Sequence, residues 1–255
     1  FPTRRSSDLR MVARECGFID AARAAGVRHL VKISAFLASL DAESKNLRDH
    51  GVIEEHLRES GLSWTVLRPH GFMQTFVYFT LDFVKDAGLY MHPAGDGTMP
   101  LVDVRDVALA AVKALTEPEA HAAQAYDLTG PEDLSFREQA RLLAAAFRRP
   151  VTYVCSSEAD VMRVMKMMKL EPQSMEHVRV VMRMTREHRI GAPTADLARL
   201  GITPTPFACF AEDLAAGRTG GGNSFAPPSG LLLSLMSALV KWTYQLRFAL
   251  LGRPT

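Results

Sequence analysis

Residues 60–74 constrain the fold of this chain more than any other segment, because they join a helix end, a buried strand and a loop. Their sequence is Ser-Gly-Leu-Ser-Trp-Thr-Val-Leu-Arg-Pro-His-Gly-Phe-Met-Gln. Gly61 supplies the left-handed backbone that closes a helix, and the uncharged run 64–67 has the aromatic and β-branched residues of a buried strand. Arg68 and Pro69 end that strand, because proline cannot donate to a β-ladder. Residues 70–74 therefore follow the carboxyl end of a strand, where open α/β sheets bind ligands.

Helices and strands alternate along the first 150 residues. Apolar residues recur at helical spacing in five segments, which are 11–25, 46–60, 76–87, 107–115 and 136–147. Strand patterns occupy 27–34, 64–67 and 126–130. This alternation is typical of crossover units, so we predict an α/β fold with a parallel sheet and helices on both faces.

Local signals refine these boundaries. Turn residues 95–97, Gly-Asp-Gly, lie between two short apolar arms and predict a loop or hairpin over 89–103. Asp106 is the expected N-cap of the helix that follows it. Ser135 and Glu138 have the spacing of a capping box, which places a helix start at Phe136.

Composition excludes several classes of protein. With 255 residues, 47% hydrophobic and 23% charged, the chain has room for one large domain or two small ones. A net charge of +2 gives no reason to expect nucleic acid as a partner. The three cysteines, Cys16, Cys155 and Cys209, are far apart and have no ligand spacing. We therefore expect a reducing cytoplasmic location and no metal site.

Four segments in this order resemble the NmrA-like branch of the atypical short-chain dehydrogenases. They are 18–34, 60–69 with Phe72-Met-Gln74, Gly95-Asp-Gly97 with 103–108, and 128–132. The resemblance covers roughly residues 11–214 and implies a Rossmann-type fold that binds NADP or NAD, with a small carboxyl-terminal substrate domain. It also implies one of two functions. Some members reduce quinones, azo dyes or related small electrophiles, and others use the cofactor only to sense redox state.

The resemblance implies a division of the chain into five parts. These are a non-native tail 1–10, a partial NAD(P)-binding Rossmann domain 11–150, a mostly helical substrate subdomain 151–216, a linker 217–230 and an amphipathic terminal helix 231–255. Residues 1–9 look like a translated sequencing adapter; a natural basic arm is the alternative. No glycine-rich turn follows a predicted strand, so we expect the chain to be a fragment that binds cofactor poorly.

The same resemblance indicates the site residues. Those expected to contact the cofactor are Ser34, Pro69, His70, Gly71 and Phe72, and no metal ligand is expected. Classical members use a Tyr and a Lys four residues later, and the corresponding positions here are Asn46 and His50. The pair is absent, so only His50 is a candidate catalytic residue.

Several of these residues have a second interpretation. His50 donates a hydrogen bond to a ribose hydroxyl or acts as an acid near neutral pH, or else it is a polar residue on a helix face. Ser34 lines the nicotinamide pocket or caps a loop. His70 contacts cofactor or substrate, or lies exposed in a loop. Asp103 and Asp106 are paired carboxylates or, as we prefer, the capped and salt-bridged start of a helix.

Two further features leave alternatives open. Seven methionines between Met162 and Met184 either line a pocket for a bulky hydrophobic substrate or form ordinary core. Residues 231–251 predict a basic amphipathic helix that lies on a membrane surface, docks on a partner or packs on its own domain. Two functions therefore remain: an NAD(P)H-dependent reductase of a small-molecule substrate, or a cofactor-binding sensor or interaction protein without turnover.

Overall fold

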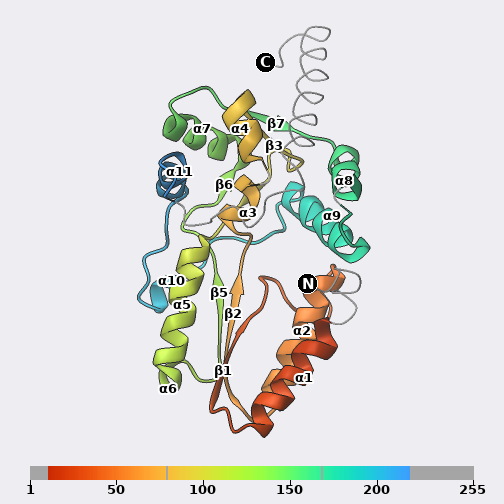
Figure 1. The fold of residues 1–255 in the computed structure, drawn as a ribbon, viewed down its shortest axis with the longest axis vertical. Helices are drawn as coiled ribbons and strands as arrows, with labels where there is room; N and C mark the ends of the chain where they lie inside the picture. Colours follow the sequence, from red (N-terminus) through yellow and green to blue (C-terminus); the bar gives the residue numbers. More distant parts are fainter. Residues whose placement is uncertain (1–10, 79, 168, 219–255) are drawn as a thin grey trace.

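The computed structural model describes residues 11–78, 80–167 and 169–218, arranged as a lower lobe around a parallel sheet and an upper lobe of helices and short strands (Figure 1). The predictions for the tail 1–10, most of the linker and the terminal helix 231–255 fall on residues outside these ranges. Within the described ranges, no helix is both long enough and apolar enough to cross a membrane.

The lower lobe confirms the predicted α/β fold. Its strands are all parallel and lie in the order β1-β2-β5, with bounds β1 (His29–Ile33), β2 (Ser63–Pro69) and β5 (Gln124–Leu128). Helices α1 (Met11–Ala24) and α2 (Lys45–Glu59) cover one face of the sheet, and α5 (Val104–Thr116) covers the other (Figure 1). The short helices α6 (Pro118–His121) and α10 (Asp196–Arg199) complete this lobe.

Helix α2 buries a charged residue together with its apolar ones. Ile53 and Leu57 are fully buried, and they pack on Ile19 of α1 and Val66 of β2. Glu54 is buried with them, whereas Val52 is exposed. Residues four apart lie on the same face of a helix, so residues one turn from Glu54 also face inward. Together they form a polar stripe along the inward face of α2. That stripe is part of the site described below.

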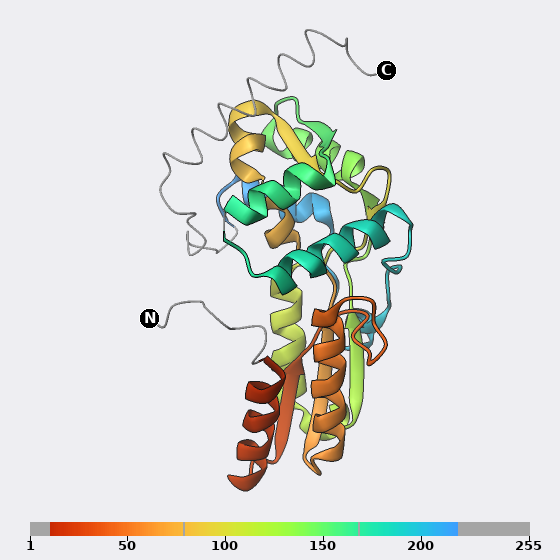
Figure 2. The same cartoon turned by 90° about the vertical axis from the view of Figure 1, so that its right-hand side faces the viewer.

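The upper lobe is assembled from short elements. They are α3 (Met73–Tyr78), α4 (Leu81–Ala87), β3 (Leu89–His92), β4 (Thr98–Met99), β6 (Leu134–Ser135), α7 (Phe136–Phe147), β7 (Thr152–Cys155), α8 (Glu158–Met167), α9 (Pro172–Arg186) and α11 (Phe207–Ala215). The predicted helix 76–87 is divided into α3 and α4. Gly88, with φ of 66°, ends α4 as predicted. Figure 2 shows α8 and α9 side by side above α1 and α2.

Of the loop or hairpin predicted over residues 89–103, the hairpin alternative is wrong. Strand β3 pairs in parallel with β7, and β4 pairs antiparallel with β6. Each arm of the expected hairpin thus finds a partner strand from a later part of the chain, Leu89 opposite Thr152 and Thr98 opposite Ser135. A local turn signal cannot report such partners, because the pairing depends on segments tens of residues away.

The helix starts follow the predicted capping chemistry with one change of residue. Ser135 and Glu138 form the expected capping box of α7. Asp103, rather than Asp106, is the N-cap of α5 and accepts a hydrogen bond from the Arg105 amide. Asp106 instead accepts two hydrogen bonds from Thr205, which anchors the chain before α11. The interpretation as a capped, salt-bridged helix start is therefore confirmed for Asp103, which also pairs with Arg105 at 2.8 Å, whereas the prediction of Asp106 as the N-cap is wrong.

The upper core draws on both sides of the domain boundary predicted at residue 150. One apolar cluster joins Met73, Tyr90 and Phe136 to Met184 and Phe210. The boundary itself stays a prediction. A separate cluster between α8 and α9 consists of Met162, Met165 and Met182, which favours the ordinary-core interpretation of these methionines.

Candidate functional site

The loops that follow β1 and β2 lie side by side at the carboxyl edge of the sheet. The Ser34 amide donates to the Leu67 carbonyl at 2.7 Å, and the Phe36 amide donates to the Pro69 carbonyl at 3.0 Å. These bonds continue the parallel ladder beyond the last paired residues of β1. The sequence-predicted segments 34–36 and 69–72 are therefore brought together.

His70 is built into this edge rather than exposed in a loop. It is 5% exposed, its ring lies 4.9 Å from that of Phe36, and its Nε2 donates to the Ile190 carbonyl at 3.2 Å. Its Nδ1 accepts a hydrogen bond from the Gly71 amide at 2.7 Å. Burial lowers the pKa of His70 to about 4, so the ring is neutral and both of its nitrogens already have partners. The exposed-loop interpretation is wrong.

A buried carboxylate lies beneath the loop that starts at Ser34. The side chain of Glu54 is 1% exposed and accepts hydrogen bonds from the Ser34 hydroxyl at 2.5 Å, from Arg68 at 3.0 and 2.6 Å, and from Arg58 at 2.8 Å. Burial alone would raise the pKa of Glu54. The hydrogen bonds from Arg68 and Ser34 and the charges of the two arginines outweigh it and lower the pKa. Glu54 is therefore a charged anchor for the ends of both strands.

His50 lies one turn before Glu54 on α2, next to a buried lysine. Lys32 of β1 places its ammonium 3.3 Å from His50 Nδ1 and 2.5 Å from a carboxylate oxygen of Glu15 on α1. Burial, followed by the charge of Lys32, lowers the pKa of His50 to about 4. His50 is therefore neutral near pH 7. Of the two chemical roles that the sequence left open for His50, a neutral ring favours the hydrogen-bond donor over the imidazolium acid.

The remaining predicted site residues have mixed surroundings. Pro69 is buried and its carbonyl is occupied by the Phe36 amide. Gly71 is half-buried, and its carbonyl accepts from the Val102 amide. Phe72 packs on the apolar cluster beneath α5, away from His50. The structure thus groups Ser34 and His50 around Glu54 and places His70 beside Phe36, while Phe72 contributes to the core.

Sequence reasoning missed Lys32, Glu54 and Arg68, which organise the site. The signal was present for two of them. Lys32 interrupts an apolar strand, and Glu54 falls on the inward stripe of α2 between Ile53 and Leu57. Charged residues at buried positions are rare unless they are paired, so such interruptions indicate a polar network.

Helix α9 closes the site from above. The Ser44 hydroxyl and His177 Nδ1 are 2.8 Å apart, and Gln173 donates to Asp49 at 2.8 Å. Both contacts join the amino-terminal end of α2 to α9. His177 also lies near enough to His50 to contribute to the lowering of its pKa. The upper lobe therefore contacts the part of α2 that carries His50.

These groups suit one half of a dinucleotide. Ser34 uses its proton on Glu54 and keeps an acceptor oxygen, and the ring of Phe36 is an apolar surface for a planar ring. Among the described residues, His50 Nε2 has no hydrogen-bond partner, which leaves a donor for a ribose hydroxyl or a substrate oxygen. The pyrophosphate half needs backbone amides at a glycine-rich turn, and the described ranges contain none after a strand of the sheet. The fit is thus to the nicotinamide and its ribose.

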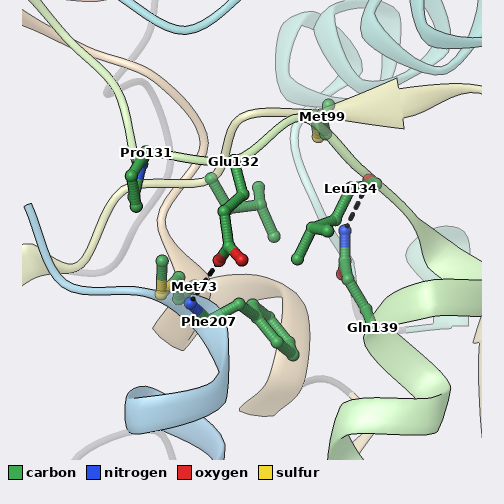
Figure 3. Close-up of a pocket in the computed structure, with 8 residues that line it drawn as sticks. Met73, Met99, Pro131, Glu132, Leu134, Gln139 and Phe207 are labelled. Carbon is green, nitrogen blue, oxygen red and sulfur yellow. Dashed lines mark hydrogen bonds between the residues drawn. The ribbon is translucent and has the colours of Figure 1, made fainter.

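A void in the upper lobe is not an alternative site. It has no room for a water molecule and is lined mainly by apolar side chains such as Met73, Met99 and Phe207 (Figure 3). The carboxylate of Glu132 points into this region and accepts a hydrogen bond from the Phe207 amide at 3.1 Å, at the start of α11 (Figure 3). Glu132 thereby satisfies a helix amide, and the void is a packing defect.

Comparison with known proteins supports the fold and NAD(P)H binding. Residues 4–118 match the model of a family described as NAD(P)H-binding. An NAD(P)H azoreductase of Xenophilus azovorans is 38% identical over 143 residues, which are 56% of this chain and 49% of the relative. The chain thus spans about half the length of this relative.

Solved structures share the fold over a larger part of the chain. The triphenylmethane reductase of Citrobacter sp. complexed with NADP(H) superposes with a TM-score of 0.72 and 22% identity, covering 84% of this chain and 74% of that one. NmrA, a negative transcriptional regulator solved with NAD, gives a TM-score of 0.62 and 18% identity, covering 81% and 70%. Residues 4–118 are therefore similar to the NAD(P)H-binding family, and the chain shares the fold of the triphenylmethane reductase and of NmrA.

Proposed function

We propose that this chain is part of an NAD(P)H-dependent reductase that acts on a small, planar electrophile such as a quinone or an azo compound. The observation that carries the proposal is the Nε2 of a neutral His50, which has no hydrogen-bond partner among the described residues and lies near Glu54, the partner of Ser34. The azoreductase relative supports this class of substrate.

The bound cofactor would supply a hydride, and the residues of this chain do the rest. Phe36 and the loop after Pro69 form an apolar wall for a planar ring, since the Pro69 carbonyl is already occupied. Ser34, held by Glu54, offers an acceptor for a polar group of the cofactor. His50 donates its Nε2 hydrogen to a ribose hydroxyl or to the substrate atom on which negative charge develops. The final proton comes from water, because a neutral His50 donates a hydrogen bond but keeps its Nε2 proton.

A non-catalytic sensor is the second candidate, because Asn46 and His50 occupy the positions of the classical Tyr and Lys. Asn46 has no proton of useful acidity, so nothing at this position can replace the classical tyrosine. NmrA, whose fold is similar, is a regulator solved with NAD, which supports a cofactor-binding role without turnover. The two candidates differ in one measurable property, which is oxidation of the cofactor.

The test measures binding and turnover separately. NADPH binding is followed by fluorescence, and NADPH oxidation is followed with a quinone and with an azo dye. Both are measured on the chain and on a longer version that includes any upstream coding sequence. Turnover that falls at least tenfold in His50→Gln, but not in His56→Gln on the exposed side of α2, supports the reductase. Binding without oxidation in either protein supports the sensor and overturns the reductase.

A further inference from the structure

Lys32 is an unusual residue for the sheet of this lobe. The strand around it is apolar, and its side chain is only 5% exposed. A buried ammonium is costly unless it is paired and hydrogen-bonded, so its contacts define what it does. It donates to Glu15 at 2.5 Å, to the Ile33 carbonyl at 3.1 Å and to His50 Nδ1 at 3.3 Å. Its three protons thus have three partners.

The contact with His50 fixes a chemical property of the imidazole. An ammonium has protons and no lone pair, so the nitrogen that faces it must accept a hydrogen bond. A neutral imidazole has one donor and one acceptor nitrogen. If Nδ1 accepts from Lys32, the ring proton is on Nε2, the nitrogen that has no partner among the described residues.

We propose that Lys32 is a positioning residue for His50: its ammonium holds the ring as the neutral tautomer with the proton on Nε2 and orients that N–H for donation. Glu15 fixes the lysine, because it holds the ammonium at the shorter of the two side-chain contacts. Lys32 of β1 thus orients His50 of α2, so the Nε2 donor is preorganised before a ligand binds. The use of that donor rests on the proposed function, but the tautomer does not.

The charged groups around His50 come from every element packed on it. Lys32 of β1 and His177 of α9 lower its pKa, while Glu15 of α1 and Glu54 of α2 raise it. Burial, the largest cause, also lowers it. Removal of the Lys32 charge should therefore raise the pKa of His50 toward its ordinary value, in addition to freeing Nδ1.

The experiment is long-range proton–nitrogen NMR of the full chain labelled at histidine, with the His50 signals assigned from the His50→Gln spectrum. The eight histidines are few enough to resolve. In the unmodified chain at neutral pH we expect His50 to carry its proton on Nε2, with this tautomer favoured by roughly tenfold or more, since a charge-assisted hydrogen bond holds it. A proton on Nδ1 would overturn the proposal, whatever the variants do.

The variants separate positioning from packing. Lys32→Met should produce a mixture of tautomers and an upward shift of the His50 titration, whereas Lys32→Arg should restore the single tautomer because it keeps the cation. Glu15→Gln, which removes the carboxylate and keeps the lysine, should leave the tautomer unchanged. Unchanged His50 signals in a folded Lys32→Met chain would refute the role of the lysine. Absence of NADPH oxidation with an intact tautomer would count against the proposed function alone.

Discussion

The burial of His70 predicts an acid-sensitive fold, and His70→Gln tests it. The ring donates through Nε2 to the Ile190 carbonyl, and a glutamine amide can reach the same acceptor but does not titrate. The pKa of His70 in the folded chain is about 4, against an ordinary value of 6.5. Between these two values the unfolded chain binds a proton that the folded chain does not.

The sign and the size of the effect follow from this difference. Because the unfolded state binds more protons, the free energy of unfolding falls as the pH falls from about 6.5 toward 4, and His70 has no further effect below that window. The effect of His70 on the free energy of unfolding is near zero at pH 7.5 and is a loss of about 2.5 kcal/mol at pH 4.5. In His70→Gln that part of the acid sensitivity should disappear, although the variant starts about 1 kcal/mol less stable because the ring contact with Phe36 is lost.

The assay is urea unfolding at several pH values between 7.5 and 4.5, followed by circular dichroism. The quantity compared is the loss of unfolding free energy over this range in the unmodified chain and in His70→Gln. His50 and His92, whose pKa values are lowered to about 4 and about 3 by burial, act in both proteins and therefore cancel. The matched control is Gly17→Ala, which removes no titratable group and should therefore leave the pH dependence unchanged.

Parallel curves for the unmodified chain and His70→Gln would refute the reasoning. They would mean that His70 takes up a proton in the folded state at an ordinary pH. The ring would then be solvated, and the closed arrangement of Phe36, His70 and Ile190 at the sheet edge would be wrong.

Four further substitutions test the packing of the two lobes by urea unfolding at pH 7.5. Glu54→Gln should cost about 3 kcal/mol, because it removes the buried charge that the half-buried Arg58 and Arg68 share; a loss below about 1 kcal/mol would contradict this. Gly130→Ala should destabilise strongly, because an added Cβ would lie 2.1 Å from the Leu101 carbonyl oxygen, whereas Gly17→Ala in open space within α1 should stabilise by about 0.5–1 kcal/mol. Ser135→Ala should cost about 1 kcal/mol through the lost capping box, and no change would mean that the box does not form.

The sequence predicted those parts of the fold that depend on neighbours along the chain. The left-handed Gly61 and Gly88, the capping box at Ser135 and the strand before His70 are all set by a few adjacent residues. The alternation of helices and strands then determined the parallel sheet, because crossover units build one. The hairpin alternative for residues 89–103 failed for the opposite reason, because the strands that pair with its two arms lie more than 30 residues away.

The site was predictable only in part, for the same physical reason. Ser34 and His70 could be placed because the carboxyl ends of parallel strands meet at one edge. The partners of His50 could not, because Lys32 and Glu15 reach it from two other elements. A periodic pattern records which face of a helix is apolar, but it does not record which charged residue of another element will lie opposite a gap in that face.

The hydrogen bonds at the sheet edge now order the predicted site residues by what each can still do for a ligand. His70 has used both ring nitrogens within the protein, so its imidazole can offer a ligand only its ring face. Ser34 has used its proton and keeps an acceptor. His50 has used its acceptor and keeps a donor. One acceptor and one donor, both held by buried charged residues, are what a ribose or nicotinamide amide requires, since each of these groups donates and accepts. Double substitution of Ser34 and His50 should therefore weaken nucleotide binding more than any change at His70 that leaves the fold intact.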